Sequence, residues 1–248
     1  MSRSKKVVEV CVDSVESAVV AQSAGAYRVE YCDNLLEGGT TPSYGQLIIV
    51  RKLLNIKLYV IIRPRGGNFL YNDIEFDIMK EDIRKCGEIG CDGIVIGILK
   101  ADGSIDKERA TELTTIANSY SMGVTFHRAF DRCRDLNIGL EDVIATGCER
   151  ILTSGGNDNA SAGAAVIKRL IANAKGRIII MPGAGLTAEN IAEVAKMTEA
   201  TEFHGTFKSR FEGGMEYINP HMAKQEKENT IFRTDYEKVR SILKTLNS

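Results

Sequence analysis

Two short stretches near the N-terminus, residues 7–12 and 27–32, alternate apolar and polar side chains around one short helical segment. Their polar faces contain carboxylates, thiols and a guanidinium: Glu9, Cys11, Arg28, Glu30 and Cys32. Parallel strands in an open sheet are covered by helices on both faces, which leaves such charges without a polar environment. A closed barrel has an interior whose C-terminal mouth accepts polar groups. We therefore expect these five side chains to point into a barrel and to line a site near its top.

The chain length and a recurring turn both fit one barrel. About 250 residues is the usual size of an eight-stranded α/β barrel, and this chain has 248. A helix end, a small-residue turn and a strand recur at 24–30, 89–95 and 146–152, with a weaker copy at 198–204. Consecutive copies are separated by the length of two βα units. The pattern predicts an α/β fold, a single (β/α)8 TIM barrel over residues 1–248.

Amphipathic helices are expected between the strands, and one long segment does not fit this scheme. The helical periodicity predicts helices at 14–23, 73–89, 106–120, 140–146, 161–174, 187–197 and 235–246. Residues 205–233 are rich in Gly, Lys and Glu and are too long for an ordinary βα loop. We expect a long insertion before the last helix that serves as a lid, a mobile segment or an oligomer contact.

Several classes of protein are not expected from the composition. The net charge is -1 at pH 7 and no basic block occurs, so binding to nucleic acid or a membrane surface driven by charge is not predicted. The longest apolar runs, such as 47–50 and 178–181, are too short to cross a bilayer. The N-terminus lacks the apolar core of a secretion signal. We expect a cytoplasmic protein, with the nucleus as a second compartment.

The cysteines favour neither a disulfide framework nor a zinc ribbon, because no CxxC pair occurs among positions 11, 32, 86, 91, 133 and 148. If Cys11 and Cys32 end neighbouring parallel strands, their backbones lie about 4.8 Å apart and the thiols lie at one height. Thiolates prefer soft ions such as Cu(I) or Zn, and no His or third Cys is adjacent in sequence to close a tetrahedral zinc site. The alternative is that both cysteines are small apolar fillers. The other four are expected to be inert.

Polar residues gather where the predicted strands end. Alternation places ten side chains inside the barrel: Glu9, Cys11, Arg28, Glu30, Cys32, Arg63, Thr125, His127, Glu202 and His204. The acid/base candidates among them are His127, Glu30, Glu9 and His204. The alternative is a buried ion-pair network that only fixes the barrel interior, because unpaired carboxylates would be costly there.

Arginines and glycine turns at the same end predict an anion site. Arg63 and Arg65 would hold an anionic substrate, and two turns could present N–H groups to a phosphate or carboxylate. The ligand-binding candidates are Arg28, Arg63, Arg65, Thr153, Gly155, Gly156, Gly183 and Gly185. The alternative is ordinary turn chemistry, for which glycine is equally suited.

Seven motifs follow one another along nearly the whole chain: EVCVDSVESA at 9–18, LLEGGTTPSYG at 35–45, IRPRGGNFLY at 62–71, VTFHRAFD at 124–131, ERILTSGG at 149–156, GRIIIMPGAGLT at 176–187 and ATEFHG at 200–205. Together they resemble the CutC copper homeostasis family and look close to its eukaryotic members. The resemblance implies a single barrel, a cytoplasmic protein that self-associates as a dimer or tetramer, and a role in copper tolerance or trafficking. It also implies that Cys11 and Cys32 bind Cu(I).

Two functional hypotheses result. The first is a cytosolic copper homeostasis protein that binds Cu(I) through a thiol pair at the barrel mouth. The alternative is a TIM-barrel enzyme that acts on a small phosphorylated or otherwise anionic metabolite, because polar loops at six strand ends exceed what a metal carrier needs.

Overall fold

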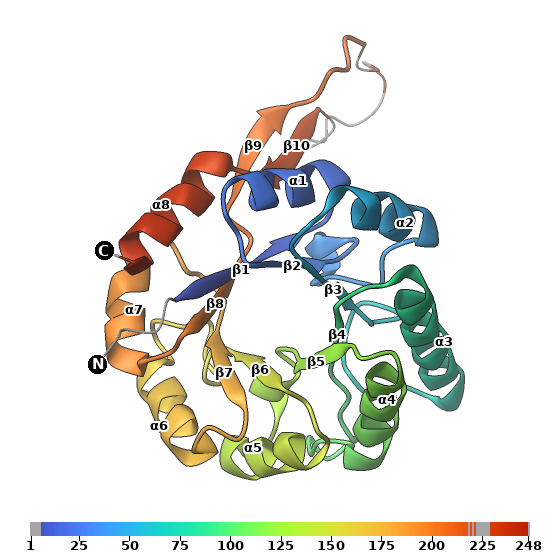
Figure 1. The fold of residues 1–248 in the computed structure, drawn as a ribbon, viewed down its shortest axis with the longest axis vertical. Coiled ribbons are helices and arrows are strands. Elements are labelled where there is room, and N and C mark those ends of the chain that lie inside the picture. The colour runs from blue at the N-terminus through green and yellow to red at the C-terminus, as the bar shows by residue number, and fades with distance from the viewer. Residues whose placement is uncertain (1–5, 218, 220, 222–228, 248) are drawn as a thin grey trace.

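The computed structural model describes residues 6–217, 219, 221 and 229–247, and its central feature is a parallel barrel. Its strands are β1 (Val7–Val12), β2 (Arg28–Tyr31), β3 (Lys57–Ile61), β4 (Gly93–Ile96), β5 (Gly123–Phe126), β6 (Arg150–Thr153), β7 (Ile179–Pro182) and β8 (Glu202–Gly205). Neighbouring strands pair in the order β7-β6-β5-β4-β3-β2-β1-β8, and β7 lies beside β8, so the sheet closes into a nearly complete ring (Figure 1). The predicted (β/α)8 barrel is confirmed.

Eight helices surround this ring in the part of the chain that is described (Figure 1). They are α1 (Val15–Ser23), α2 (Tyr44–Leu53), α3 (Asp73–Ile89), α4 (Lys107–Ser119), α5 (Leu136–Ala145), α6 (Ala164–Ala174), α7 (Ile191–Thr198) and α8 (Tyr236–Asn247). Short 3-10 turns occur at Leu35–Glu37 and Phe130–Arg132. The apolar faces of the strands and helices form one continuous core between the two rings.

Side-chain caps explain one helix that was not predicted and one helix whose predicted start was wrong. Helix α2 was not predicted, yet Ser43 and Gln46 form a reciprocal capping box at its start. Helix α5 begins four residues before its predicted start, because the Asp135 side chain accepts hydrogen bonds from the N–H groups of Asn137 and Ile138. The glycine of the recurring turn has the expected role: Gly90 ends α3 with φ of 83°.

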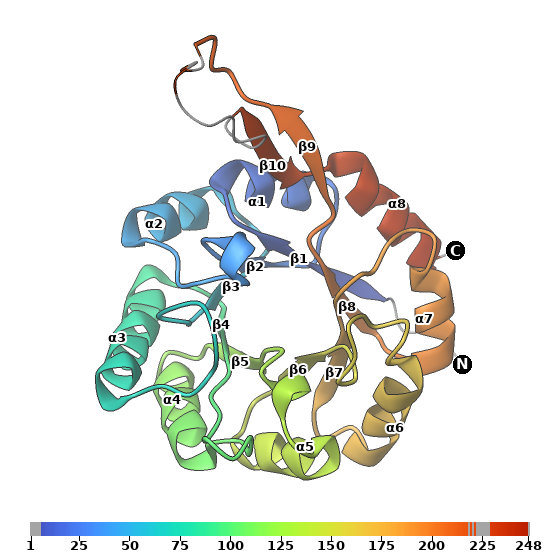
Figure 2. The ribbon, with the colours of Figure 1, turned by 180° about the vertical axis from the view of Figure 1, so that it is seen from behind.

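The insertion before the last helix forms an antiparallel hairpin of β9 (Lys208–Glu212) and β10 (Thr230–Thr234). It projects outward past α1, outside the ring of helices (Figure 2), and it is anchored there because the Thr234 N–H donates to the Ser17 hydroxyl at 3.1 Å. Its described residues therefore do not form a lid over the barrel. Positions 218, 220 and 222–228 of the predicted insertion lie outside the described residues. No described helix has the length and apolar character of a bilayer span.

Candidate functional site

A cavity of about 320 Å³ opens at the C-terminal end of the barrel strands. Six of the polar residues predicted to point inward line it: Cys11, Glu30, Cys32, Arg63, His127 and His204. Apolar side chains such as Leu35, Ile61 and Phe69 complete its walls. Alternation in the sequence placed these six side chains inside the barrel, and the structure brings them together in one cavity.

The two thiols face each other in the cavity wall, with Cys11 Sγ 3.6 Å from Cys32 Sγ. They do not lie at one height as predicted, because the strand register pairs Cys11 with Glu30. Gly39 passes close to the pair: a Cβ atom at that position would lie 3.4 Å from Cys32 Sγ. A glycine there lets the loop cover the thiols without displacing them.

Burial keeps both thiols protonated at neutral pH. The hydrogen bond with Cys32, followed by burial, raises the pKa of Cys11 well above its usual range. The same hydrogen bond lowers the pKa of Cys32, but burial and the charge of Glu30 outweigh it and raise that pKa to about 11. The pair is therefore not a reactive nucleophile in the free protein, and a bound cation would be needed to stabilise the thiolates.

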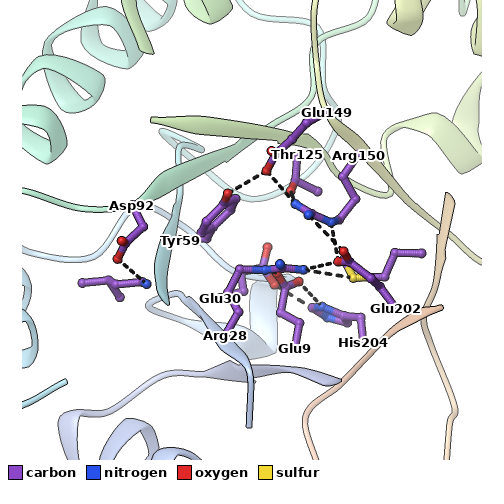
Figure 3. A network of polar contacts seen from close by, with 12 residues as sticks. Glu9, Arg28, Glu30, Tyr59, Asp92, Thr125, Glu149, Arg150, Glu202 and His204 are labelled. Atoms are coloured by element: carbon purple, nitrogen blue, oxygen red, sulfur yellow. Dashed lines mark hydrogen bonds and ion pairs between the residues drawn. The ribbon is translucent and has the colours of Figure 1, made fainter. Parts of the chain in front are cut away.

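The His204 ring contacts the carboxylates of Glu9 and Glu30 (Figure 3). Its Nδ1 is 2.7 Å from Glu9 Oε1, and its Nε2 is 3.6 Å from Glu30 Oε2. Burial lowers the pKa of His204, but hydrogen bonds to Cys11 and Glu9 and the carboxylate charges outweigh it and raise that pKa well above its usual value. These contacts therefore favour the protonated form of His204.

The two carboxylates respond to this environment in opposite directions. Burial raises the pKa of Glu9, but the charges of Arg28 and His204 outweigh burial, and the net effect lowers that pKa. Burial dominates at Glu30, so the pKa of Glu30 is raised. One ligand atom each from Cys11, Glu30 and His204 lie within 4.8 Å of one another, which is a geometry that a metal ion could use.

A network of buried ion pairs occupies the barrel interior (Figure 3). The Arg28 guanidinium joins Glu9 and Glu202, and its Nη2 lies 2.8 Å from Glu202 Oε2. Arg150 lies 2.7 Å from the same Glu202 oxygen. Arg28, a predicted ligand-binding residue, does not line the cavity. Neither does Glu9, a predicted acid/base residue. Both belong instead to the interior ion-pair network that was the alternative prediction.

Arg150 was missed by the sequence reasoning. Its Nη1 donates to Thr125 Oγ1 at 3.1 Å and to Glu149 Oε1 at 2.8 Å, and Glu149 also accepts from the Tyr59 hydroxyl at 2.6 Å. No local pattern in the sequence marked Arg150, because its inward position follows from a register that only the structure shows, in which it is the partner of Thr125 on the neighbouring strand.

Arg63 and His127 occupy the cavity wall, whereas Arg65 lies on the rim. The Arg63 guanidinium donates to the carbonyl oxygens of Glu37, Gly39 and Gly67 at 2.6–2.9 Å. Arg65 is only partly buried and pairs with Glu75, with Nε 2.5 Å from Oε1. Arg65 is not among the cavity-lining residues.

One of the two predicted anion-binding turns already holds a carboxylate of the chain. Asp131 accepts hydrogen bonds from the Ser154 and Gly156 N–H groups at 3.0–3.1 Å and from the Thr153 hydroxyl at 2.5 Å. The Gly155 N–H donates to Thr153 Oγ1. The sequence reasoning assigned no role to Asp131, although it lies in the quoted motif at 124–131.

The second predicted turn borders the cavity. Gly185 lines it directly. The Gly183 N–H donates to the Thr153 carbonyl at 3.0 Å, and a Cβ atom at Gly183 would lie 2.5 Å from the Leu152 side chain. Gly183 is thus fixed by close packing between β6 and β7.

Comparison with known proteins gives one consistent result. The model of the CutC family matches residues 6–209. A human protein named copper homeostasis protein cutC homolog is 47% identical over 239 residues, covering 95% of this chain and 87% of the human protein. A family protein CutC from Bacteroides fragilis is 42% identical over 247 residues, covering 96% and 98%.

Solved structures agree with this result. The crystal structure of a CutC protein from Streptococcus agalactiae is 38% identical, has a TM-score of 0.77, and covers 81% of this chain and 98% of that one. Phosphoribosylanthranilate isomerase from Thermotoga maritima is 10% identical with a TM-score of 0.59, covering 97% and 98%, and shows similarity of fold alone.

Proposed function

This chain belongs to the CutC copper homeostasis family, and we propose that its Cys11 and Cys32 bind Cu(I) at the barrel mouth. The observation that carries this proposal is the 3.6 Å separation of the two sulfurs in the wall of the cavity. Soft thiolate ligands select Cu(I) over hard ions. The copper ion would be cargo, and it would enter through the open end of the barrel.

The neighbouring side chains suit a site that exchanges protons for a metal ion. Thiols bind a metal as thiolates, so two protons must leave as Cu(I) binds. Glu30 could accept one of these protons, because it interacts with Cys11 and its raised pKa brings it closer to that of a thiol, and the second proton would pass to solvent. Cys11, Glu30 and His204 are also ligand types that zinc accepts, so the affinity for zinc should be compared with the affinity for Cu(I).

A competition titration with a chromophoric Cu(I) chelator tests the proposal on the reduced protein. Changing a residue that only supports a metal ligand typically lowers metal affinity by roughly 10–100-fold. The double variant Cys11→Ser and Cys32→Ser removes the ligands themselves, so its Cu(I) affinity should fall by more than this. Cys133→Ser is the matched control, because Cys133 is a free cysteine outside the cavity, and its affinity should equal that of the wild type. Equal Cu(I) affinity of the double variant, or a preference for zinc in the wild type, would contradict the proposal.

The proposal extends to the setting in which the protein acts. All six cysteines are free, which suits the reducing cytoplasm, with the nucleus as a second compartment. Fractionation of cells followed by detection of the protein tests this location. Recovery of the protein outside the cell would contradict it.

Self-association as a dimer or tetramer is part of the same proposal. The β9–β10 hairpin exposes Phe211 and the Ile231 opposite it, and a two-stranded hairpin gains stability when another surface packs on it. Light scattering should give a mass above that of one chain. Phe211→Lys should reduce that mass, whereas an unchanged mass would place the contact elsewhere.

An enzyme acting on a small anionic metabolite is the second candidate function. Two observations favour it: Arg63 Nε and His127 Nε2 are buried without a hydrogen-bond partner, and both residues line the same cavity. Active sites of this fold lie at this end of the barrel. Turnover of a small organic acid by the purified protein would establish this function.

A further inference from the structure

Arg63 is a buried cation with no counter-ion among the described residues. Its side chain is 4% exposed, and its hydrogen bonds go to the neutral carbonyls of Glu37, Gly39 and Gly67. The other two buried arginines of the barrel, Arg28 and Arg150, each pair with carboxylates. Because an uncompensated buried charge is strongly unfavourable, the environment of Arg63 calls for an anion that the chain itself does not supply.

The free nitrogen of Arg63 is accompanied by a second donor on His127. His127 is 5% exposed, and its Nδ1 accepts a hydrogen bond from the Ala129 N–H at 3.0 Å. Burial and the charge of Arg63 lower the pKa of His127 to about 3, so the ring is neutral. A neutral imidazole whose Nδ1 is an acceptor carries its proton on Nε2. That Nε2–H is a buried donor without a partner.

One aromatic ring links the two donors. The Phe69 ring centroid lies 5.2 Å from Arg63 Cζ and 4.9 Å from the His127 ring centroid. All three residues line the cavity. The two residues that carry the unpaired N–H groups therefore contact the same ring and line the same cavity, next to apolar side chains such as Ile61 and Leu152.

We propose that Arg63 and His127 bind the carboxylate of a small organic acid in this cavity. Two N–H donors on separate side chains match the two oxygens of one carboxylate, and the single charge of Arg63 balances its single negative charge. A phosphate dianion is less well matched, because one of the two turns that could complete a phosphate site, the turn at 153–156, already holds Asp131. The apolar wall is suited to a short carbon chain. Neither residue belongs to the thiol pair, so the inference does not depend on copper binding.

The experiment uses the reduced, copper-free protein labelled with nitrogen-15 at histidine, in a buffer without carboxylates. Propionate should shift the His127 Nε2–H resonance and saturate with a Kd of about 1 mM or below. Propionamide has the same shape without the charge and should leave the resonance unchanged. An unchanged resonance with propionate, an equal response to propionamide, or tighter binding of inorganic phosphate would overturn the proposal.

Matched variants show whether the two named donors carry the binding. Arg63→Met should weaken propionate binding at least tenfold, whereas Arg177→Met, the same substitution on a surface arginine that pairs with Glu141 outside the cavity, should leave it unchanged. His127→Phe retains a ring and should also weaken binding tenfold, which keeps the test decisive if Arg63→Met does not fold. Propionate binding is measured on copper-free protein, so failure of the copper proposal and failure of this one are distinguishable. Wild-type affinity in His127→Phe would overturn the proposal.

Discussion

Cys11 and Cys32 bring their sulfurs within 3.6 Å of each other, although the strand register places Cys11 opposite Glu30 rather than opposite Cys32. The thiols therefore meet diagonally across β1 and β2, on the face that points into the barrel. This offset places a carboxylate with a raised pKa against Cys11. We therefore expect the thiols to lose their protons in a way that depends on the charge of the neighbouring groups, so metal binding should depend on pH.

Cu(I) affinity should rise with pH between about pH 6 and 8, by up to about tenfold per pH unit for each proton that a thiol releases. The reason is that the pKa of Cys11 is raised and that of Cys32 is about 11, so both sulfurs are protonated throughout this range. Competition with the chelator, corrected for the protonation of the chelator itself, measures the slope. An affinity independent of pH would show that the bound ion does not displace thiol protons.

His204→Gln should destabilise the protein most at low pH. The pKa of His204 is raised on folding, so its contribution to stability is complete below its unfolded pKa of about 6.5 and is lost as the pH rises through its folded pKa. The difference in unfolding free energy between wild type and variant should decrease by up to about 1.4 kcal/mol per pH unit above pH 6.5. Urea denaturation at several pH values measures it.

His127→Gln is the control with the opposite sign. The pKa of His127 is lowered to about 3, so its contribution is complete above its unfolded pKa of about 6.5 and is lost as the pH falls towards 3. The wild-type advantage over this variant should grow as the pH rises towards 6.5. Parallel pH profiles for the two histidine variants would mean that the charges assigned to these rings are wrong.

The barrel and the set of polar side chains that face its interior were predictable because both depend on side-chain periodicity. Alternation put Glu9, Cys11 and Glu30 on the interior face, and the recurring glycine turn marked the helix ends. Strand register could not be predicted from periodicity, because it is set by the closure of the whole ring. The relative height of Cys11 and Cys32 was therefore predicted incorrectly.

The residues that sequence reasoning missed are those whose roles depend on distant partners. Asp131 lies in a loop and was assigned no role, but its carboxylate accepts hydrogen bonds from the turn at 153–156, which is more than twenty positions further along the chain. Arg150 lies next to Glu149 in the sequence, yet it also pairs with Glu202, which is 52 positions further along the chain. Neither contact leaves a local pattern, whereas the missed helix α2 had one in its capping residues Ser43 and Gln46.

Arg150→Met should cost about 3–5 kcal/mol of unfolding free energy, since it removes one partner of a buried ionic network and leaves Glu202 with Arg28 alone. Urea denaturation at neutral pH measures the change. Arg177→Met is the matched control, because Arg177 pairs with Glu141 on the surface and exposed pairs contribute little. Equal stabilities of the two variants would show that the interior network does not support the barrel.

Two glycine substitutions should change stability in opposite directions. A Cβ atom at Gly93 would lie 2.4 Å from the Tyr59 ring, which is buried and held by its hydrogen bond to Glu149, so Gly93→Ala should cost about 1–3 kcal/mol through overpacking. Gly45 lies in α2 with nothing within 4 Å of an added Cβ, so Gly45→Ala should gain roughly 0.5–1 kcal/mol through helix propensity. Thermal and urea unfolding measure both. A neutral Gly93→Ala would mean that Tyr59 moves freely, and the interior network that its hydroxyl joins would then be looser than the structure shows.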